Sequence, residues 1–241
     1  AVLLVPLRAS TATVTLALGG VPLQWRLFAE ILKVGIPGML NVGITNLSVV
    51  ILTGIAVHLG QETAIGYAMG ARLEYILIPL AFGFGTAIVS MVGTNWGAGR
   101  FDRARRIAWT GGITVAVACG SIGTFVALFP GTWMGLFSDE EEIVRAGSSY
   151  LRIAGPIYAL YGLGMALYFA AQGLGRVLAA VAANGIRIAV SACGGAVAVF
   201  WLDTGSTGFF IAIAAGFLVY GGLTACALLR LLKPASGASK T

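Results

Sequence analysis

Two charged side chains that could do chemistry, Arg72 and Glu74, lie within an otherwise apolar stretch of the sequence. Charges deep in such a segment are costly and mark a functional or paired site by default. Residues two apart lie on nearly opposite sides of a helix, so each needs a partner elsewhere or an aqueous cavity. Glu74 is the best candidate for taking up a proton or cation. An equally open alternative is structural, with both residues clamping helix packing and Arg72 reaching toward water.

A second polar group lies in the preceding apolar stretch. Asn41, Thr45 and Asn46 are spaced i, i+4 and i+5, which places them on one helix face. They suit either hydrogen bonding between helices or the lining of a cavity.

Prolines interrupt two of the apolar stretches. Pro79 cannot donate a hydrogen bond to the Tyr75 carbonyl, so a kink is expected beside the Glu74 carboxylate, as a gate or as a fixed bend for packing. Pro156 does the same later in the chain, and Tyr158 and Tyr161 follow it closely.

Methionines and aromatic residues could form an adaptable apolar pocket for bulky amphiphilic cations, although membrane helices are rich in such residues anyway. The set consists of Met39, Tyr67, Met69, Met91, Tyr158, Met165 and Tyr168.

Catalysis by this chain is not expected. A membrane-embedded enzyme needs a nucleophile with a base, or metal ligands at depth, whereas this sequence has one histidine, His58, at a helix end. The cysteines Cys119, Cys193 and Cys226 show no CxxC spacing. We therefore expect no catalytic residue, no metal site and no cofactor other than a coupling ion.

The elements that position these residues are six stretches without a charged residue, each able to hold most of a membrane-spanning helix. They run between Lys33 and Glu62, Glu74 and Arg100, Arg106 and Asp139, Arg152 and Arg176, Arg187 and Asp203 (extendable back to Leu178), and Asp203 and Arg230. None alternates as a β-barrel strand would. The sequence predicts an all-α polytopic membrane protein with six transmembrane helices.

The composition agrees with a lipid environment. Of 241 residues, 58% are hydrophobic and 10% are charged, whereas soluble domains carry about 25% charged residues. The net charge of +6 comes from basic residues at the ends of apolar runs, which indicates membrane orientation and not nucleic-acid binding. The bilayer is therefore the expected partner.

The connectors suggest how the chain is divided. Residues 1–30 are expected to hold the end of a preceding helix and a cytoplasmic linker, residues 31–230 a six-helix lobe, and residues 231–241 a cytoplasmic tail. Asp102 is expected to cap the third helix, and Ser138 with Glu141 to form a capping box for the fourth.

Lysines and arginines are distributed very unevenly between alternate loops. Twelve fall on one side and two, Arg145 and Arg152, on the other, with Arg72 inside the membrane. Because basic loops stay cytoplasmic, a plasma (bacterial inner) membrane protein with a cytoplasmic C-terminus is expected.

The loop Val92 to Arg106 reads V-G-T-N-W-G-A-G-R-F-D-R-A-R-R. With Gly93, Asn95, Gly97, Gly99 and Arg100 in place, it resembles the V-G-x-N-x-G-A-G-R motif of the multidrug and toxic compound extrusion (MATE) family. Further matches are Gly35-Ile36-Pro37 opening a helix, Arg72-Leu73-Glu74, Leu136 to Asp139 and Gln172 to Gly175. Their order is similar to the C-terminal lobe of a MATE transporter over residues 31–230. A nucleotide-phosphate loop is disfavoured, because no strand precedes it and no G-K-[ST] follows.

The resemblance implies half of a two-lobe, twelve-helix transporter in which H⁺ or Na⁺ entry drives export by alternating access. The N-terminal lobe is then expected in the same protein or in a second chain. Some MATE branches carry acidic residues on the first and fourth helices of this lobe. Here Thr45 and Asn46 occupy the first position and residues 155–163 contain no carboxylate. Branches that couple through an N-lobe aspartate would leave this half only a substrate wall.

We therefore expect a cation-coupled antiporter that exports drugs, organic cations or metabolites, with Pro37, Pro79 and Pro156 as gating or kink residues. The alternatives are a lipid-linked saccharide flippase of the same superfamily and a non-transporting half. A flippase needs a more cationic groove for its diphosphate, and the sequence suggests Arg72 as the one cation in mid-helix.

Overall fold

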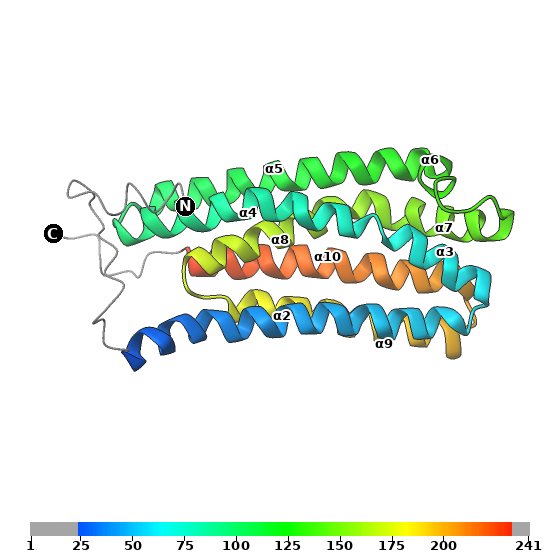
Figure 1. The fold of residues 1–241 in the computed structure, drawn as a ribbon, viewed down its shortest axis with the longest axis horizontal. Helices are drawn as coiled ribbons and strands as arrows, with labels where there is room; N and C mark the ends of the chain where they lie inside the picture. Colours follow the sequence, from blue (N-terminus) through cyan, green and yellow to red (C-terminus); the bar gives the residue numbers. More distant parts are fainter. Residues whose placement is uncertain (1–23, 233–241) are drawn as a thin grey trace, which may run out of the picture. The chain divides into compact units, whose positions relative to one another are not determined.

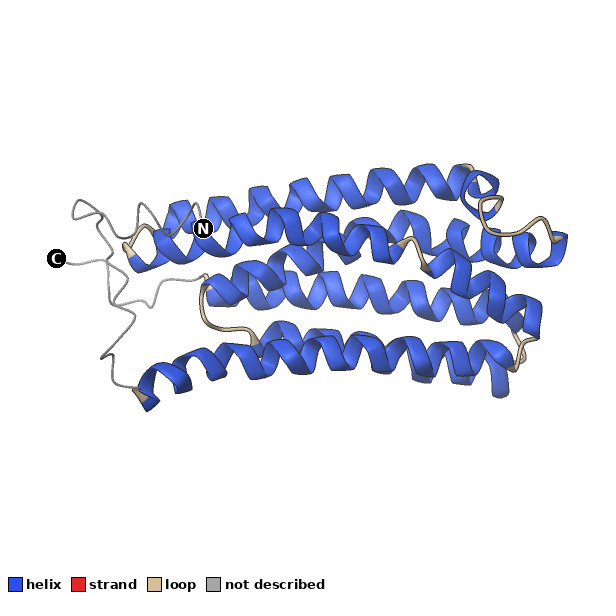
Figure 2. Cartoon of the chain, viewed as in Figure 1, coloured by secondary structure: helices blue, strands red, loops and turns tan. Residues whose placement is uncertain are grey.

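Residues 24–232 are described in the computed structural model, and every regular element among them is a helix (Figures 1 and 2). The elements are α2 (Trp25–Val57), α3 (Gln61–Ala71), α4 (Glu74–Gly97), α5 (Phe101–Leu128), α6 (Pro130–Met134), α7 (Glu141–Ala154), the 3-10 turn η1 (Gly155–Ile157), α8 (Tyr158–Gly173), α9 (Leu178–Phe200) and α10 (Gly205–Leu231). The predicted all-α fold is confirmed. The expected end of a preceding helix and most of the linker and tail lie outside the described residues.

Six stretches of this part of the chain are long and apolar enough to span a membrane, as predicted. They are Trp25–Val57, Gln61–Gly97, Phe101–Leu128, Glu141–Gly173, Leu178–Phe200 and Gly205–Leu231. The second span combines α3 and α4, and the fourth combines α7, η1 and α8.

The second span is broken at Arg72 and Leu73, which form a turn between α3 and α4 (Figure 2). Leu73 N–H donates to the Gly70 carbonyl at 3.1 Å, and Ile76 N–H to the Leu73 carbonyl at 3.0 Å. These i to i−3 bonds tighten the chain locally. The break therefore lies before Pro79, which is inside α4, and the carboxylate of Glu74 is placed at the start of a new helix.

The fourth span is broken where the sequence predicts. Pro156 lies in the 3-10 turn η1, which separates α7 from α8. Because proline has no N–H to donate, the α-helical ladder cannot continue through it. Tyr158 begins α8 directly after the turn.

The chain divides into two units at Lys33 and Val34, and the larger unit holds the packed helices. Within it, α9 packs along α10, and α8 packs against α4, α5 and α10 (Figure 1). Close approach depends on glycine: a Cβ on Gly66 would lie 2.6 Å from the Ile143 carbonyl oxygen, and one on Gly70 would lie 2.7 Å from the Tyr150 ring. These two glycines, four residues apart, therefore allow α3 to pack closely against α7. Gly97 has no such neighbour, so no close crossing occurs at that position.

Pro37 does not open a helix. It is buried well inside α2, which begins at Trp25, within the stretch expected to be a cytoplasmic linker. The residues before it continue the helix upstream, and the missing proline N–H removes only one bond from the ladder. Few of the residues of α2 are buried, and exposed apolar side chains such as Met39 and Val50 cover much of its surface.

The glycine-rich loop after α4 forms a compact helix end. Gly99 has φ of +72°, its N–H donates to the Trp96 carbonyl at 3.0 Å, and the Arg100 N–H donates to the Asn95 carbonyl at 2.8 Å. This pair of bonds is a Schellman motif, which needs the left-handed backbone that glycine adopts freely. The end of α8 repeats it, with Gly175 at φ +67° and Arg176 N–H donating to the Ala171 carbonyl at 3.0 Å.

The predicted side-chain caps are wrong. Ser138 accepts a hydrogen bond from the Glu140 N–H at 3.1 Å but does not cap α7, whose N-cap residue is Glu140. Asp102 lies in the first turn of α5 without making a cap hydrogen bond. Its charge still suits the positive end of the helix dipole.

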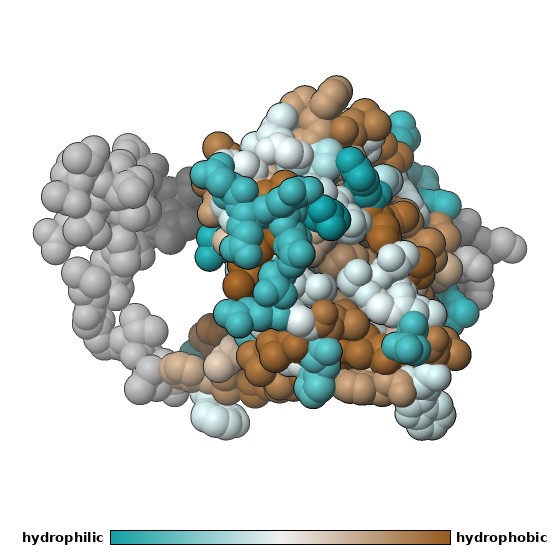
Figure 3. All heavy atoms as spheres, turned by 90° about the vertical axis from the view of Figure 1, so that its right-hand side faces the viewer, coloured by the Kyte–Doolittle hydropathy of each residue, from teal (hydrophilic) through white to brown (hydrophobic). Residues whose placement is uncertain are grey.

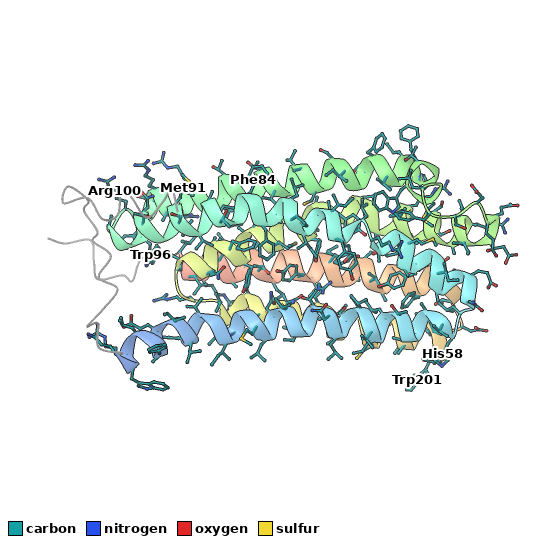
Figure 4. The ribbon with its side chains drawn as sticks, viewed as in Figure 1. His58, Phe84, Met91, Trp96, Arg100 and Trp201 are labelled. Carbon is teal, nitrogen blue, oxygen red and sulfur yellow. The ribbon has the colours of Figure 1, made fainter. Side chains whose placement is uncertain are left out.

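Exposed acidic residues lie at one end of the packed helices. Figure 4 shows Trp96 and Arg100 at one end and His58 and Trp201 at the other. Figure 3 looks onto the second end, where hydrophilic residues gather above hydrophobic sides. Exposed acidic residues at the loop before α7 and in its first turn contribute to this surface: Asp139, Glu140, Glu141 and Glu142.

Candidate functional site

A cavity of about 540 Å³ lies within the larger unit, between α2, α3, α4, α8, α9 and α10. This volume falls in the range typical of sites for drug-sized ligands. Most of its walls are apolar or aromatic, and a few polar and charged side chains project into it. Seven of the eight predicted binding residues line it: Asn41, Thr45, Asn46, Tyr67, Arg72, Glu74 and Tyr161.

Glu74 lines the cavity from the first turn of α4 and is held by two tyrosines. Tyr150 donates its hydroxyl to Glu74 Oε1 at 2.7 Å, and the Tyr158 hydroxyl lies 3.5 Å from the same oxygen. The two hydroxyls also lie 3.1 Å apart. Tyr158 is the predicted binding residue that does not line the cavity. It contacts Glu74 through its hydroxyl. The partner that the sequence required for Glu74 is therefore this tyrosine pair.

Arg72 lines the same cavity but is exposed. Its guanidinium carbon lies 5.2 Å from the centroid of the Phe137 ring, a cation–π contact with the loop before α7. Arg72 and Glu74 do not form an ion pair with each other, as their spacing predicts; the ion pairs among the described residues are Arg26–Glu30 and Arg145–Glu141.

The polar face of α2 meets α9 through one amide. Asn184 Nδ2 donates to Asn41 Oδ1 at 2.8 Å and to Thr45 Oγ1 at 3.0 Å. Asn46 instead donates to the Val42 carbonyl of its own helix at 3.0 Å. Both readings of this face are thus realised: it makes hydrogen bonds between helices and lines the cavity.

Arg187 is the functional candidate that sequence analysis missed. The loop count places it among the twelve basic residues of the cytoplasmic side, but it lies near the middle of α9, is 4% exposed and lines the cavity. Its Nε donates to Asn184 Oδ1 at 2.8 Å, and its guanidinium lies over the rings of Tyr161 and Phe217. The sequence contains a signal for this position, because a membrane-spanning helix that begins at Leu178 has Arg187 near its middle. Arg72 is therefore not the one cation in mid-helix.

The remaining predicted residues lie elsewhere. Pro37, Pro79 and Pro156 are not among the residues that line the cavity. Gly93, Asn95, Gly97, Gly99 and Arg100 belong to the end of α4 and the loop after it, at the opposite end from His58 (Figure 4). Of the methionine and aromatic set, Tyr67, Met165 and Tyr168 line the cavity, whereas Met39 and Met91 are exposed.

No group of three His, Cys, Asp or Glu side chains that could hold a metal ion is found within residues 24–232. The cavity instead offers one carboxylate, two guanidinium groups, side-chain amides and tyrosine rings. Such a set can bind charged and aromatic groups of a small molecule.

The fold and the six long apolar stretches define a multi-pass membrane protein with a cavity between its helices. A family model described as MatE matches residues 37–197, which is more than half of the chain. The chain therefore belongs to the MATE family.

Two curated relatives carry names that agree with this family. The chain is 25% identical over 160 residues to "Probable multidrug resistance protein NorM" of Thermotoga maritima, covering 66% of this chain and 34% of that protein. It is 28% identical over 161 residues to "Probable multidrug resistance protein YpnP" of Bacillus subtilis, covering 67% of this chain and 36% of that protein. The matches thus span about a third of each relative.

Solved structures show the same fold. A structure described as the MATE transporter ClbM in complex with Rb⁺ matches with a TM-score of 0.79 at 20% identity, over 88% of this chain and 49% of that one. A MATE structure in the straight conformation matches with a TM-score of 0.84 at 18% identity, over 92% of this chain and 50% of that one. The fold of this chain corresponds to about half of each transporter.

Proposed function

We propose that this chain is the C-terminal lobe of a cation-coupled antiporter that exports drugs, organic cations or related metabolites by alternating access. The observation that carries the proposal is the Glu74 carboxylate, which lines the cavity and is held by the hydroxyls of Tyr150 and Tyr158. A fixed carboxylate in a low-dielectric cavity can exchange a proton or Na⁺ for the cationic group of a substrate.

The proposed partner is an N-terminal lobe, in the same protein or in a second chain, that supplies the opposite wall of the pathway. This part of the proposal is supported by the solved structures, because this chain matches only about half the length of each. The proposed setting is the plasma membrane, multi-pass, with a cytoplasmic C-terminus, on the grounds of the basic loops.

The test replaces Glu74 by Gln in the purified chain and in the complete reading frame that contains it. In weakly buffered detergent solution, addition of an organic cation should release protons from the unaltered chain and not from E74Q. In cells, E74Q should lower pH-driven export of the same cation at least about tenfold, since a neutral amide cannot exchange a proton.

Glu62→Gln is the matched control, because Glu62 lies in the first turn of α3 and does not line the cavity. Measurable proton release that is equal in E74Q and the unaltered chain would remove Glu74 from the mechanism.

A second candidate, a lipid-linked saccharide flippase, gains support from Arg187. Arg72 and Arg187 both line the cavity, so it is more cationic than the sequence suggested. In a deletion strain, accumulation of a lipid-linked precursor without increased drug accumulation would favour the flippase. A non-transporting half would produce neither effect.

A further inference from the structure

Arg187 is a buried cation without an acidic partner at ion-pair distance among the described residues. Its relative exposure is 4%, and the ion pairs in the described part of the chain involve other arginines. A guanidinium taken out of water is costly unless an anion and well-placed acceptors compensate it. Its position is therefore unusual for a group with a purely structural role.

The groups that hold Arg187 are neutral. Asn184 accepts the hydrogen bond from Nε at 2.8 Å, and the ring centroids of Tyr161 and Phe217 lie 5.7 and 5.5 Å from the guanidinium carbon. Asn184 is in turn fixed by Asn41 and Thr45. These contacts orient the guanidinium without placing an anion against it.

The two terminal nitrogens of Arg187 remain available. The guanidinium donates its hydrogen bond to Asn184 through Nε. Among the described residues, Ser191 Oγ is the side-chain nitrogen or oxygen that is fully buried and has no hydrogen-bond partner. The terminal nitrogens of Arg187 are not in this category, so they are not fully buried by protein atoms. Because Arg187 lines the cavity, these N–H groups face ligand space. Their parallel geometry matches the two oxygens of a carboxylate or phosphate.

An opposite charge lines the same cavity at a separate place. Glu74 projects from α4, bonded to Tyr150, and lies beyond ion-pair distance of Arg187. Aromatic side chains such as Phe82, Phe217 and Tyr220 line the space they share. The cavity thus offers an anionic group, a cationic group and an apolar wall.

We propose that the cavity binds zwitterionic aromatic amphiphiles, with the oxyanion of the ligand held by Arg187 and its ammonium group held by Glu74. The ammonium half rests on the proposed function of Glu74, whereas the oxyanion half rests on Arg187 alone. The proposal narrows the substrate from organic cations in general to compounds that also carry a carboxylate or phosphate.

The experiment measures the affinity of the purified, detergent-solubilised chain for matched probes. They are 2-naphthylalanine, which has both charges; its methyl ester, which has only the ammonium; and 3-(2-naphthyl)propionic acid, which has only the carboxylate. The zwitterion should bind at least about tenfold more tightly than either, since each loses one charge-assisted contact. A phosphonate analogue of naphthylalanine separates the two oxyanions, and tighter binding of that analogue would assign the subsite to a phosphate group.

Variants separate the two halves. In R187Q the preference for naphthylalanine over its methyl ester should disappear, while affinity for the ester is retained. R187K should restore part of that preference. In E74Q the preference for naphthylalanine over its methyl ester should remain. The preference for naphthylalanine over naphthylpropionic acid should disappear. R176Q is the control, because Arg176 is exposed after α8 and does not line the cavity.

The proposal would be overturned if the unaltered chain bound naphthylalanine and its methyl ester with equal affinity, or if it did not bind naphthylalanine. That comparison needs no variant, so misfolding of R187Q cannot obscure it. If instead E74Q changes nothing while R187Q abolishes the acid preference, the proposed function of Glu74 fails and the oxyanion subsite stands.

Discussion

At the scale of single residues, the tyrosines around Glu74 illustrate how a carboxylate is accommodated inside a membrane protein. Tyr150 and Tyr158 are fully buried, and both direct their hydroxyls at the same carboxylate oxygen. The 2.7 Å bond from Tyr150 has the length of a charge-assisted bond, and the 3.5 Å separation from Tyr158 is at the limit of a hydrogen bond. Tyr150 should therefore contribute more to stability.

The corresponding prediction concerns removal of single hydroxyls. Tyr150→Phe should lower the free energy of unfolding by about 2 kcal/mol, because it loses its bond to Glu74 and the contact with Tyr158. Tyr158→Phe should cost about 1 kcal/mol. Denaturant titration in mixed micelles measures both, and Tyr168→Phe, whose side chain lines the cavity, should change little. A larger loss for Tyr158→Phe than for Tyr150→Phe would contradict this assignment.

At the scale of elements, glycines determine how closely α3 approaches α7. The added Cβ of a Gly66→Ala variant would lie 2.6 Å from the Ile143 carbonyl oxygen and 2.8 Å from the Gly147 nitrogen. Backbone atoms cannot move aside as a flexible side chain can, so the helices must separate. We expect a loss of about 1–3 kcal/mol in the free energy of unfolding.

Gly83→Ala is the matched control, because its added Cβ would meet no atom within 4 Å other than those of its own stretch of α4. It should be neutral or stabilising by up to about 1 kcal/mol, since alanine is the better helix former. Thermal unfolding of both variants in one detergent makes the comparison. Equal destabilisation of the two would show that the α3–α7 contact does not limit packing.

The attachment of α2 to α9 provides a second prediction at this scale. Asn184 joins the helices through Asn41 and Thr45, and few other residues of α2 are buried. Asn184→Ala should therefore increase amide hydrogen exchange along α2 and leave that of α5 unchanged. Asn95→Ala removes a bond within α4 only and serves as the control. Unaltered exchange in α2 would indicate that apolar contacts suffice to hold it.

At the scale of the whole molecule, the charge of the loops predicts the orientation in the membrane. Because Arg187 lies in the interior, the loops of the basic side hold eleven lysines and arginines instead of twelve, against two on the other side. The asymmetry is still large, so the loop after α4 should be cytoplasmic and the loop before α7 external.

Reporter fusions check this orientation. Green fluorescent protein placed after Thr241 should fluoresce, and alkaline phosphatase at the same position should be inactive, because phosphatase folds only outside the cytoplasm. A fusion within the loop at Asp139 should give the opposite pattern. Active phosphatase at the C-terminus would reverse the assigned topology.

Much of this protein follows from its sequence alone. The number of spans follows from charge-free apolar stretches, since only a helix satisfies the backbone within lipid. The interruption at Pro156 and the positive φ at Gly99 follow from the chemistry of proline and glycine. Spacing also shows that Arg72 and Glu74 cannot pair with each other. These properties are local, and each is decided within a few residues of chain.

Tertiary structure decided which groups share a space. The sequence could not show that Tyr150 would bond Glu74, or that Asn184 on α9 would meet Asn41 on α2, because helix packing brings together residues far apart in the chain. It also misplaced Arg187, since its apolar stretch can be read as beginning on either side of that charge. Only the length and packing of α9 place Arg187 at the cavity, where we propose that it binds the oxyanion of a ligand.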